Sequence, residues 1–283
     1  MCRLFGFRSV IDGQVHQSLV HADNALKTQS VNHPDGWGVA YYISGAPHIV
    51  KSTDMAKNSS LFQKVSGVVS SKTVLAHIRK STIGNINILN THPFQFGPWV
   101  FAHNGNIKGF SEHREEIIKK IDPDLSKFIL GDTDSEILFY FLLTYIKTSF
   151  GLASEKLELP SLVNILRKSV QDLVDIIGEM DAIGEGSSET FLTFLLTNGS
   201  LLIGHQGGKK LYYSTFKKQC PERDTCPKFN LTCENPVQSG KVNHLILSSE
   251  PTLSENIWKE IPFRGIIAAD DELGLHIDFI KNP

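Results

Sequence analysis

The sequence predicts an α+β protein in which helices cover antiparallel sheets. Short apolar or alternating runs bounded by turn residues fill the first half of the chain and return near its end, as is typical of strands. Between them, the region from 133 to 177 has two stretches with helical features. This order shows neither an internal repeat nor the regular strand–helix alternation of a doubly wound parallel sheet.

Each expected element of the first two thirds has its own signal. Thr133-Asp134-Ser135-Glu136 has the form of a capping box and opens the apolar stretch Ile137–Ile146, which we expect to be a buried helix. A second helix is expected after Pro160, because apolar residues recur with a helical period within Leu162–Ile177. The strands expected before these helices are Leu4–Ile11, Trp37–Ser44, Thr73–Arg79 and Trp99–Ala102.

The last third predicts a return to strands. Asn198-Gly199 is a two-residue hairpin signal between the expected strands Thr190–Thr197 and Leu201–His205. The polar segment Lys217–Gly240 is rich in Cys, Pro and Asn and is interpreted as an inserted loop. We therefore expect one domain over residues 2–283 with an insertion at 217–240. Further strands are expected at Lys210–Thr215, Val242–Ser248, Gly265–Ala269 and Leu275–Ile280.

Composition excludes several classes of protein. The 283 residues are 41% apolar, enough for a core without disulfides, and four cysteines are too few for a disulfide scaffold. Twenty-eight basic and 30 acidic side chains give a formal charge of −2 without long runs of one sign, so we expect no nucleic-acid partner. The most apolar run is too short to span a bilayer and no secretory signal is visible. We therefore expect no membrane partner and a cytoplasmic protein.

Cys2 is the first candidate for chemistry. A small residue after the initiator permits removal of Met1, and Cys2 would then carry both a thiol and a free α-amine. An α-amine titrates at ~7.7–8.0, so it can take the thiol proton and return it to a leaving amine. The simpler interpretation is a small apolar residue that starts a strand, and position alone favours it.

Two further segments carry polar groups suited to an amino-acid substrate. Arg79 ends an expected strand and is followed by hydroxyl residues that include Thr82; a guanidinium and a hydroxyl can together hold a carboxylate. Asn104 and Gly105 follow another expected strand, and an Asn amide with the next Gly N–H can face one developing negative charge. Taken singly, the first segment is more often a surface ion pair and the second a turn.

Asp134 stands at the expected helix start, where it is either a simple cap or a carboxylate that holds a substrate ammonium. Together, Cys2, Arg79, Thr82, Asn104-Gly105 and Asp134 resemble, in order and type, the class II glutamine amidotransferases, a family of N-terminal-nucleophile amide hydrolases. The resemblance implies that Cys2 is the nucleophile. It implies that Asn104 and Gly105 hold the oxyanion, that Arg79 and Thr82 bind the substrate α-carboxylate, and that Asp134 binds its α-ammonium.

The resemblance extends beyond these residues. His33-Pro34-Asp35-Gly36-Trp37-Gly38 and Thr91-His92-Pro93-Phe94 are similar to the small stand-alone branch without a synthase domain. The main resemblance covers about residues 2–146, with weaker similarity at Ser249-Glu250-Pro251, and it implies a four-layer αββα sandwich of antiparallel sheets. Lys80 departs from many relatives, and the 217–240 insertion has no counterpart.

The implied reaction is cleavage of the γ-amide of glutamine or of a γ-glutamyl compound through a Cys2 thioester, without cofactor or metal. The spacing of Cys220, Cys226 and Cys233 does not fit a structural zinc site and favours unpaired loop thiols. Three alternatives remain open: a γ-glutamyl-peptide or conjugate hydrolase of thiol metabolism, a glutaminase subunit that supplies ammonia to a separate synthase, and a catalytically silent scaffold. The resemblance is also compatible with a homodimer.

Overall fold

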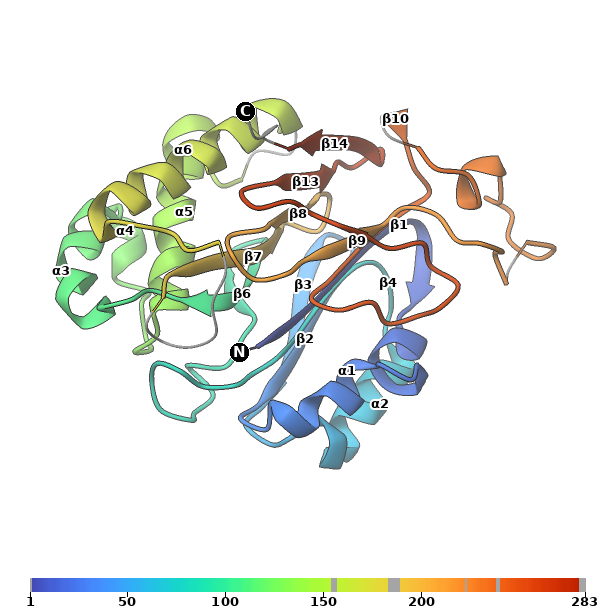
Figure 1. The fold of residues 1–283 in the computed structure, drawn as a ribbon, viewed down its shortest axis with the longest axis horizontal. Coiled ribbons are helices and arrows are strands. Elements are labelled where there is room, and N and C mark those ends of the chain that lie inside the picture. Colours follow the sequence, from blue (N-terminus) through green and yellow to red (C-terminus); the bar gives the residue numbers. More distant parts are fainter. Residues whose placement is uncertain (1, 154–156, 183–188, 222, 238–239, 280–283) are drawn as a thin grey trace.

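The computed structural model describes residues 2–153, 157–182, 189–221, 223–237 and 240–279. Within these ranges the strands form two antiparallel sheets, drawn in Figure 1. The first sheet has the order β12-β9-β11-β1-β4-β2-β3 and the second the order β10-β14-β13-β8-β7-β6-β5.

The strands of the first sheet are β1 (Arg3–Gln14), β2 (Trp37–Ile43), β3 (Ala46–Ser52), β4 (Ser70–Ile78), β9 (Tyr212–Ser214), β11 (His244–Ser248) and β12 (Lys259–Glu260). Those of the second are β5 (Phe94–Phe96), β6 (Trp99–Asn106), β7 (Phe191–Thr197), β8 (Leu202–His205), β10 (Gly240–Lys241), β13 (Ile266–Ala269) and β14 (Gly274–Asp278). The α-helices are α1 (Leu26–Gln29), α2 (Ser60–Val68), α3 (Phe110–Lys120), α4 (Pro123–Ser126), α5 (Asp134–Phe150) and α6 (Leu159–Ile177). Short π or 3-10 turns are η1 (Gln17–His21), η2 (Ser30–Asn32), η3 (Ala56–Asn58) and η4 (Leu231–Cys233).

Three apolar clusters define four layers. One cluster, with Trp37 and Phe62, lies between the first sheet and helices α1 and α2. A second, with Leu4 and Leu195, lies between the two sheets, and a third, with Phe139, lies between the second sheet and α3, α5 and α6. The fold is therefore the α+β, four-layer αββα sandwich that the sequence predicted, and Figure 1 shows the helices on its two outer faces.

Strand alternation decides which side chains enter the space between the sheets. Leu4 of β1 and Leu75 of β4 belong to the cluster between the sheets, whereas their chain neighbours Phe5 and Ala76 pack on the helix side. On β6, Ala102 faces the space between the sheets. Since side chains alternate along a strand, Cys2, Arg79 and Asn104 continue the inward-facing rows.

The helices follow their sequence signals. Thr133 caps α5 by accepting a hydrogen bond from the Glu136 N–H at 3.2 Å. The Glu136 carboxylate accepts from the N–H groups of Leu130 (3.1 Å) and Gly131 (2.6 Å), so the capping interaction reaches further back than the predicted box. α5 is longer than the apolar stretch Ile137–Ile146 that predicted it, because the polar residues of its first turn and the residues Lys147–Phe150 at its end are helical too.

Two strand predictions need correction. β6 runs through Asn106, four residues beyond the predicted end, because Asn104 and Gly105 pair with β7. The hairpin of β7 and β8 is confirmed, but its loop has four residues and not two: Thr197 pairs with Leu202. The Asn198 side chain explains the longer loop, since its Oδ1 accepts from the Leu201 N–H at 3.1 Å.

The sequence reasoning missed the strands β3, β5, β10 and β12 and the helices α1, α2, α3 and α4. β3 is an edge strand with partly exposed residues on both faces, so it lacks the apolar alternation of the inner strands. In the described part of the 217–240 segment, the Lys217 N–H donates to the Cys233 carbonyl and the Lys218 N–H to the Glu255 carbonyl, both at 2.8 Å. The predicted strand end at Ile280 lies outside the described residues. No described helix combines the length and apolar composition needed to cross a bilayer.

Candidate active site

The Cys2 side chain lies where β1 begins and β4 ends. The two strands are antiparallel, with Arg3 opposite Ile78, so the residues after β4 come beside Cys2. The Lys80 N–H donates to the Cys2 sulfur at 3.3 Å, and the sulfur lies 3.4 Å from the Lys80 carbonyl oxygen, which can accept the thiol proton. Cys2 is 8% exposed, whereas Met1 lies outside the described residues.

The surroundings of Cys2 keep its thiol protonated. Burial raises the pKa of Cys2, and the Lys80 N–H and the Arg79 charge oppose this only in part. Asp134 is also close enough to raise this pKa through its negative charge. Because the neutral thiol is favoured, any nucleophilic attack by this sulfur would require a base that removes its proton.

Arg79 is buried, with 2% of its surface exposed, and its guanidinium binds the loop that follows β4. Nη1 donates to the Asn85 carbonyl at 3.1 Å, and Nη2 donates to the Ile83 carbonyl at 3.1 Å and the Ser81 hydroxyl at 3.2 Å. Burial lowers the pKa of Arg79, and the nearby acidic groups oppose this effect. The guanidinium therefore organises this loop.

Asp35 fixes the same loop from the other side. Its Oδ2 accepts from the Ser81 N–H at 2.8 Å, and its own N–H donates to the Arg79 carbonyl at 3.1 Å. Sequence reasoning found Asp35 in the His33–Gly38 motif but derived no role for it. Thr82 follows in this loop and is exposed; no contact among the described residues links it to the other candidates.

Asn104 is joined to the β1 end of the site through Ser249. The Ser249 hydroxyl accepts from the Leu4 N–H at 2.9 Å and lies 3.5 Å from Asn104 Nδ2. The Ser249 N–H donates in turn to the Leu4 carbonyl at 3.0 Å. Asn104 is 3% exposed, and its Oδ1 has no hydrogen-bond partner within the described structure. The weak resemblance at Ser249–Pro251 was the only sequence signal for this serine.

Gly105 occupies a position that excludes a side chain. An added Cβ would lie 2.0 Å from the Phe191 carbonyl oxygen and 2.4 Å from His103 Nε2. Both neighbours are held, because His103 Nε2 is hydrogen-bonded to that carbonyl at 2.9 Å. A carbonyl can only accept, so Nε2 carries the hydrogen.

Asp134 connects the start of α5 to the end of β6. Its Oδ2 accepts from the Ile107 N–H at 2.7 Å, and its Oδ1 lies 3.2 Å from the Ser135 hydroxyl. That hydroxyl is 2.9 Å from His103 Nδ1. Burial raises the pKa of Asp134, while the His103 ring and the hydrogen bonds oppose the rise. Asp134 is thus a buried acid whose hydrogen bonds link the start of α5 to the end of β6.

Two more histidines lie behind the site. The rings of His77 and His92 are 4.2 Å apart between centroids, and within the described part of the chain their ring nitrogens have no hydrogen-bond partner. Burial lowers the pKa of both well below the usual value for histidine. Gly38, which pairs with His77, leaves space for the His92 carbonyl, 2.2 Å from where a Cβ would be. This glycine therefore permits close approach of the His92 backbone.

The structure thus brings Cys2, Arg79, Asn104, Gly105 and Asp134 to one end of the space between the sheets. Figure 1 shows this end of β1 near the centre of the molecule. Within the described ranges, no group of three or more His, Cys, Asp or Glu side chains could hold a metal ion. The other three cysteines are also free thiols in the described structure.

A four-layer αββα sandwich of two antiparallel sheets, with Cys2 just before the central strand β1, is the fold of the N-terminal-nucleophile hydrolases. A family model described as "Glutamine amidotransferases class-II" matches residues 1–263, so the chain belongs to that family.

Relatives and a solved structure agree with this assignment. The Saccharomyces cerevisiae protein named "Probable glutamine amidotransferase DUG3" is 30% identical over 227 residues, which cover 72% of this chain and 62% of that protein. "Gamma-glutamyl-hercynylcysteine sulfoxide hydrolase" of Mycobacterium tuberculosis is 31% identical over 119 residues, 38% of this chain and 50% of that protein. The matches thus cover less than two thirds of these relatives. A solved glutamine aminotransferase class-II domain protein from Silicibacter pomeroyi has the same fold, with a TM-score of 0.63, 18% identity, and coverage of 99% of this chain and 100% of that one.

Proposed function

We propose that this chain is an amidohydrolase that cleaves the γ-amide of glutamine or of a γ-glutamyl compound through a thioester on Cys2. The observation that carries the proposal is the placement of the buried Cys2 thiol at the start of β1, where the loop after Arg79 contacts its sulfur. The Asn104 amide is linked to the same end of β1 through Ser249. Family membership supports the reaction class. The proposed catalytic unit is one domain over residues 2–283 with the 217–240 insertion.

The first step is proton transfer from the thiol to the α-amine of Cys2, exposed after removal of Met1. The sulfur attacks the substrate amide carbon, and the resulting oxyanion accepts hydrogen bonds from Asn104 Nδ2 and the Gly105 N–H. The α-ammonium then returns the proton to the leaving nitrogen as the C–N bond breaks, which releases ammonia or an amine. The raised pKa of Cys2 supports this role for the amine, because the thiol is neutral at rest.

Water completes the reaction. It attacks the γ-glutamyl thioester, the α-amine takes a proton from the water, and the proton returns to the sulfur as the C–S bond breaks. Glutamate or the free γ-glutamyl acid is released and the thiol is restored. These two steps need no cofactor or metal.

Arg79, Thr82 and Asp134 are proposed to hold the zwitterionic end of the substrate. The α-carboxylate would replace loop oxygens at the Arg79 guanidinium, which now binds Asn85 and Ile83. The α-ammonium would pair with Asp134, and this pairing would favour its ionised form against the effect of burial. Matched charges at fixed distance would select a γ-glutamyl group.

A conjugate as natural substrate is the second candidate, supported by the similarity to the mycobacterial γ-glutamyl-hercynylcysteine sulfoxide hydrolase. The two candidates share all the residues above and differ in the leaving group. Comparing kcat/KM for glutamine with that for γ-glutamyl dipeptides separates them. Low activity of the unmodified purified chain with both substrates, although its Cys2 reacts with a glutamine-like electrophile in a separate sample, would favour an ammonia-supplying subunit that requires a synthase.

Intact-mass measurement tests the shared mechanism. Treatment with diazo-oxo-norleucine, a glutamine-like electrophile, should give a protein that lacks Met1 and carries one adduct, mapped to Cys2. Cys233 is the matched control thiol, since it is also buried with 8% exposure, and it should stay unmodified. Retention of Met1, or a processed Cys2 that reacts no faster than Cys233, would contradict the proposed nucleophile.

A further inference from the structure

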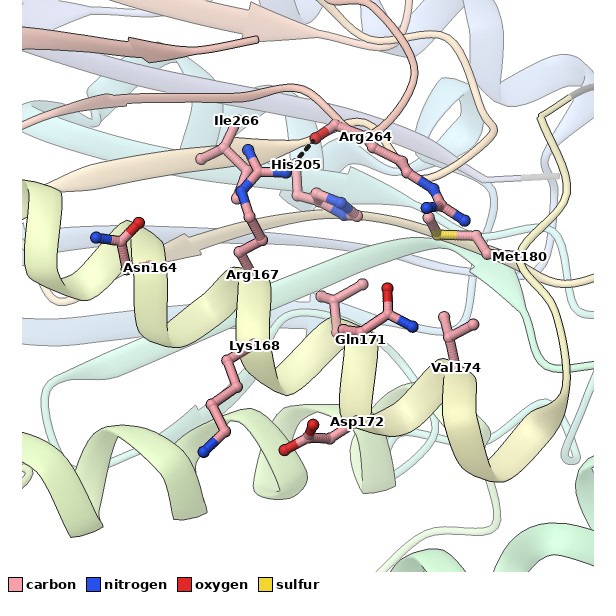
Figure 2. A pocket seen from close by; sticks show the side chains of 11 residues that line it. Asn164, Arg167, Lys168, Gln171, Asp172, Val174, Met180, His205, Arg264 and Ile266 are labelled. Atoms are coloured by element: carbon pink, nitrogen blue, oxygen red, sulfur yellow. Dashed lines mark hydrogen bonds between the residues drawn. The ribbon is translucent and has the colours of Figure 1, made fainter. Parts of the chain in front are cut away.

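A cavity of about 420 Å³ lies between α6 and the strands β8 and β13, on the outer side of the second sheet. None of the site residues described above lines it. Figure 2 shows side chains from α6 and from the opposing strand segments converging on it. The volume is in the range of small-molecule sites, ~300–1,000 Å³. The lining residues that matter here are Arg167, Gln171, Val174, Met180, His205 and Arg264.

The Arg167 charge is already compensated. Its Nη2 and Nε donate to Asp278 Oδ2 at 2.6 and 3.1 Å, which is a charge-assisted pair. Its Nη1 donates to the Arg264 backbone carbonyl at 3.3 Å. Arg167 therefore forms a fixed wall of the cavity and contributes little net charge to it.

The Arg264 charge is not compensated. Its guanidinium packs 5.4 Å from the centroid of the Phe263 ring, and its buried Nε has no hydrogen-bond partner among the described residues. Nor does any described carboxylate form an ion pair with it. A partly buried guanidinium that lines a cavity and pairs with no described carboxylate favours a ligand that supplies a negative charge.

The other two charged lining residues are one cation and one anion, Lys168 and Asp172, so they add no net charge. Lys168 and Asp172 are one turn apart on α6, and Figure 2 shows both directed away from the group formed by His205, Arg264 and Met180. Asp172 also accepts a hydrogen bond from the Tyr145 hydroxyl at 2.7 Å. Among the described residues, the charged groups around the cavity therefore sum to about one positive charge, which belongs to Arg264.

His205 adds an acceptor. Its Nδ1 lies 2.8 Å from the Leu192 carbonyl, so Nδ1 donates and Nε2 carries the lone pair in the neutral ring. Burial, together with the charges of Arg167 and Arg264, lowers the pKa of His205 to about 4 although the Leu192 bond opposes it. The ring is therefore neutral at pH 7, and its Nε2 can accept a hydrogen bond from a ligand.

The cavity also has an apolar part. Val174 and Met180 are 8% exposed and Ile266 is 1% exposed, and all three line the cavity. An apolar body on the ligand would cover these side chains. The Arg264 charge, the His205 Nε2 acceptor and the apolar lining together indicate what kind of ligand would fit the cavity.

We propose that this cavity binds a small monocarboxylate that has an apolar body and a hydrogen-bond donor. The carboxylate pairs with the planar guanidinium of Arg264, the donor reaches His205 Nε2, and the body packs on Val174 and Met180. One uncompensated positive charge matches a singly charged carboxylate better than a doubly charged phosphate. The inference is independent of the reaction at Cys2.

Titration calorimetry on the full chain tests the proposal with three probes. 4-Hydroxyphenylacetate has a carboxylate, a ring and a donor; 4-hydroxyphenylacetamide lacks the charge, and phenylacetate lacks the donor. We expect saturable 1:1 binding of the first probe. The amide should bind at least ~10-fold more weakly and phenylacetate ~3–10-fold more weakly, since hydrogen bonds to charged groups are the stronger ones.

Matched variants assign the site. Arg264→Met should weaken 4-hydroxyphenylacetate binding at least ~10-fold and remove the preference for acid over amide. Arg114→Met, the same change on partly exposed α3, should leave binding unchanged. Gln171→Trp should block the cavity from the exposed side of α6, and circular dichroism reports whether each variant is folded.

Several outcomes would overturn the proposal. These are the absence of saturable binding at millimolar probe, equal affinity for acid and amide, and normal binding by folded Arg264→Met or Gln171→Trp. Binding that is lost in Arg79→Lys but kept in Arg264→Met would place the probe at the candidate active site and would also refute this cavity as the carboxylate site. None of these results depends on turnover, so they are distinct from failure of the proposed reaction.

Discussion

Replacing Asn104 with Ala tests the proposed oxyanion site most directly. The side chain is 3% exposed, so its N–H acts in a region with little water, where a donor stabilises a developing charge strongly. In the resting structure Nδ2 has only a 3.5 Å contact to the Ser249 hydroxyl, at the limit of a hydrogen bond. The substitution therefore removes little from the resting state and nearly all of its effect should fall on the transition state.

The expected loss of kcat is that for removing one of the two proposed oxyanion donors, Asn104 Nδ2 and the Gly105 N–H. Removing a single oxyanion donor costs ~10²–10³ in kcat, equivalent to ~2.7–4 kcal/mol. The Gly105 N–H remains, so turnover should fall by this factor without disappearing. KM should change little, because the neutral amide of the bound substrate carries no full charge for Asn104 to stabilise.

The assay is steady-state release of glutamate from glutamine or a γ-glutamyl dipeptide, with kcat and KM determined separately. Asn243→Ala is the control, since Asn243 uses its Nδ2 to bind Cys233 Sγ at 2.8 Å, outside the site. A folded Asn104→Ala variant with kcat within ~3-fold of the unmodified protein, or one with raised KM and unchanged kcat, would refute the reasoning.

Three other predictions concern binding, packing and pH. Arg79→Lys should raise KM at least ~10-fold with a smaller change in kcat, because an ammonium cannot replace a two-pronged contact; an unchanged glutamine dependence would remove Arg79 from the binding site. Gly105→Ala should lower the free energy of unfolding by at least ~1–3 kcal/mol, because the new Cβ would lie 2.0 Å from a carbonyl oxygen of β7. The control is Gly67→Ala in α2, where no contact is nearer than 3.7 Å, and it should raise the free energy of unfolding by ~0.5–1 kcal/mol. Chemical denaturation measures both changes. Burial lowers the pKa of His205 to about 4 and that of His244 to about 3, so the unfolded chain binds more protons below ~6.5, and the melting temperature should fall as pH decreases from 6.5 to 4; a constant value would contradict these shifts.

Local patterns predicted the elements whose environment is uniform. α5 and α6 are buried along a whole face or more, so their apolar residues recur with a period that the sequence displays. The inner strands β1, β2 and β4 were predicted in the same way, from short apolar or alternating runs bounded by turn residues. β3 did not, because an edge strand with both faces partly exposed has little reason to alternate.

The site was predictable only in part. The order of the motifs identified Cys2, Arg79, Asn104, Gly105 and Asp134 as candidates through family resemblance. The contacts between these residues could not be predicted in this way, because family resemblance implies the role of each residue but gives no strand register and no distance between atoms.

The length of β6 shows where local reasoning stops. Asn-Gly has a strong turn preference, yet Asn104 and Gly105 are paired with β7 along the strand. Cross-strand pairing and the packing of His103 on the Phe191 carbonyl outweigh the local preference here. A turn prediction from two residues contains no information about the strand that will lie beside them.

The sequence by itself determined the α+β class, the main helices, the hairpin of β7 and β8, and the chemical types of the candidate site, since each depends on residues close together in the chain. Only the tertiary structure decided that Ser249 links Leu4 to Asn104, that Arg79 organises its own loop, and that Arg264 lines a cavity with its Nε unpaired among the described residues. The physical reason is that periodicity and turn chemistry act locally, whereas sheet register and the packing of one layer on another join residues far apart in sequence.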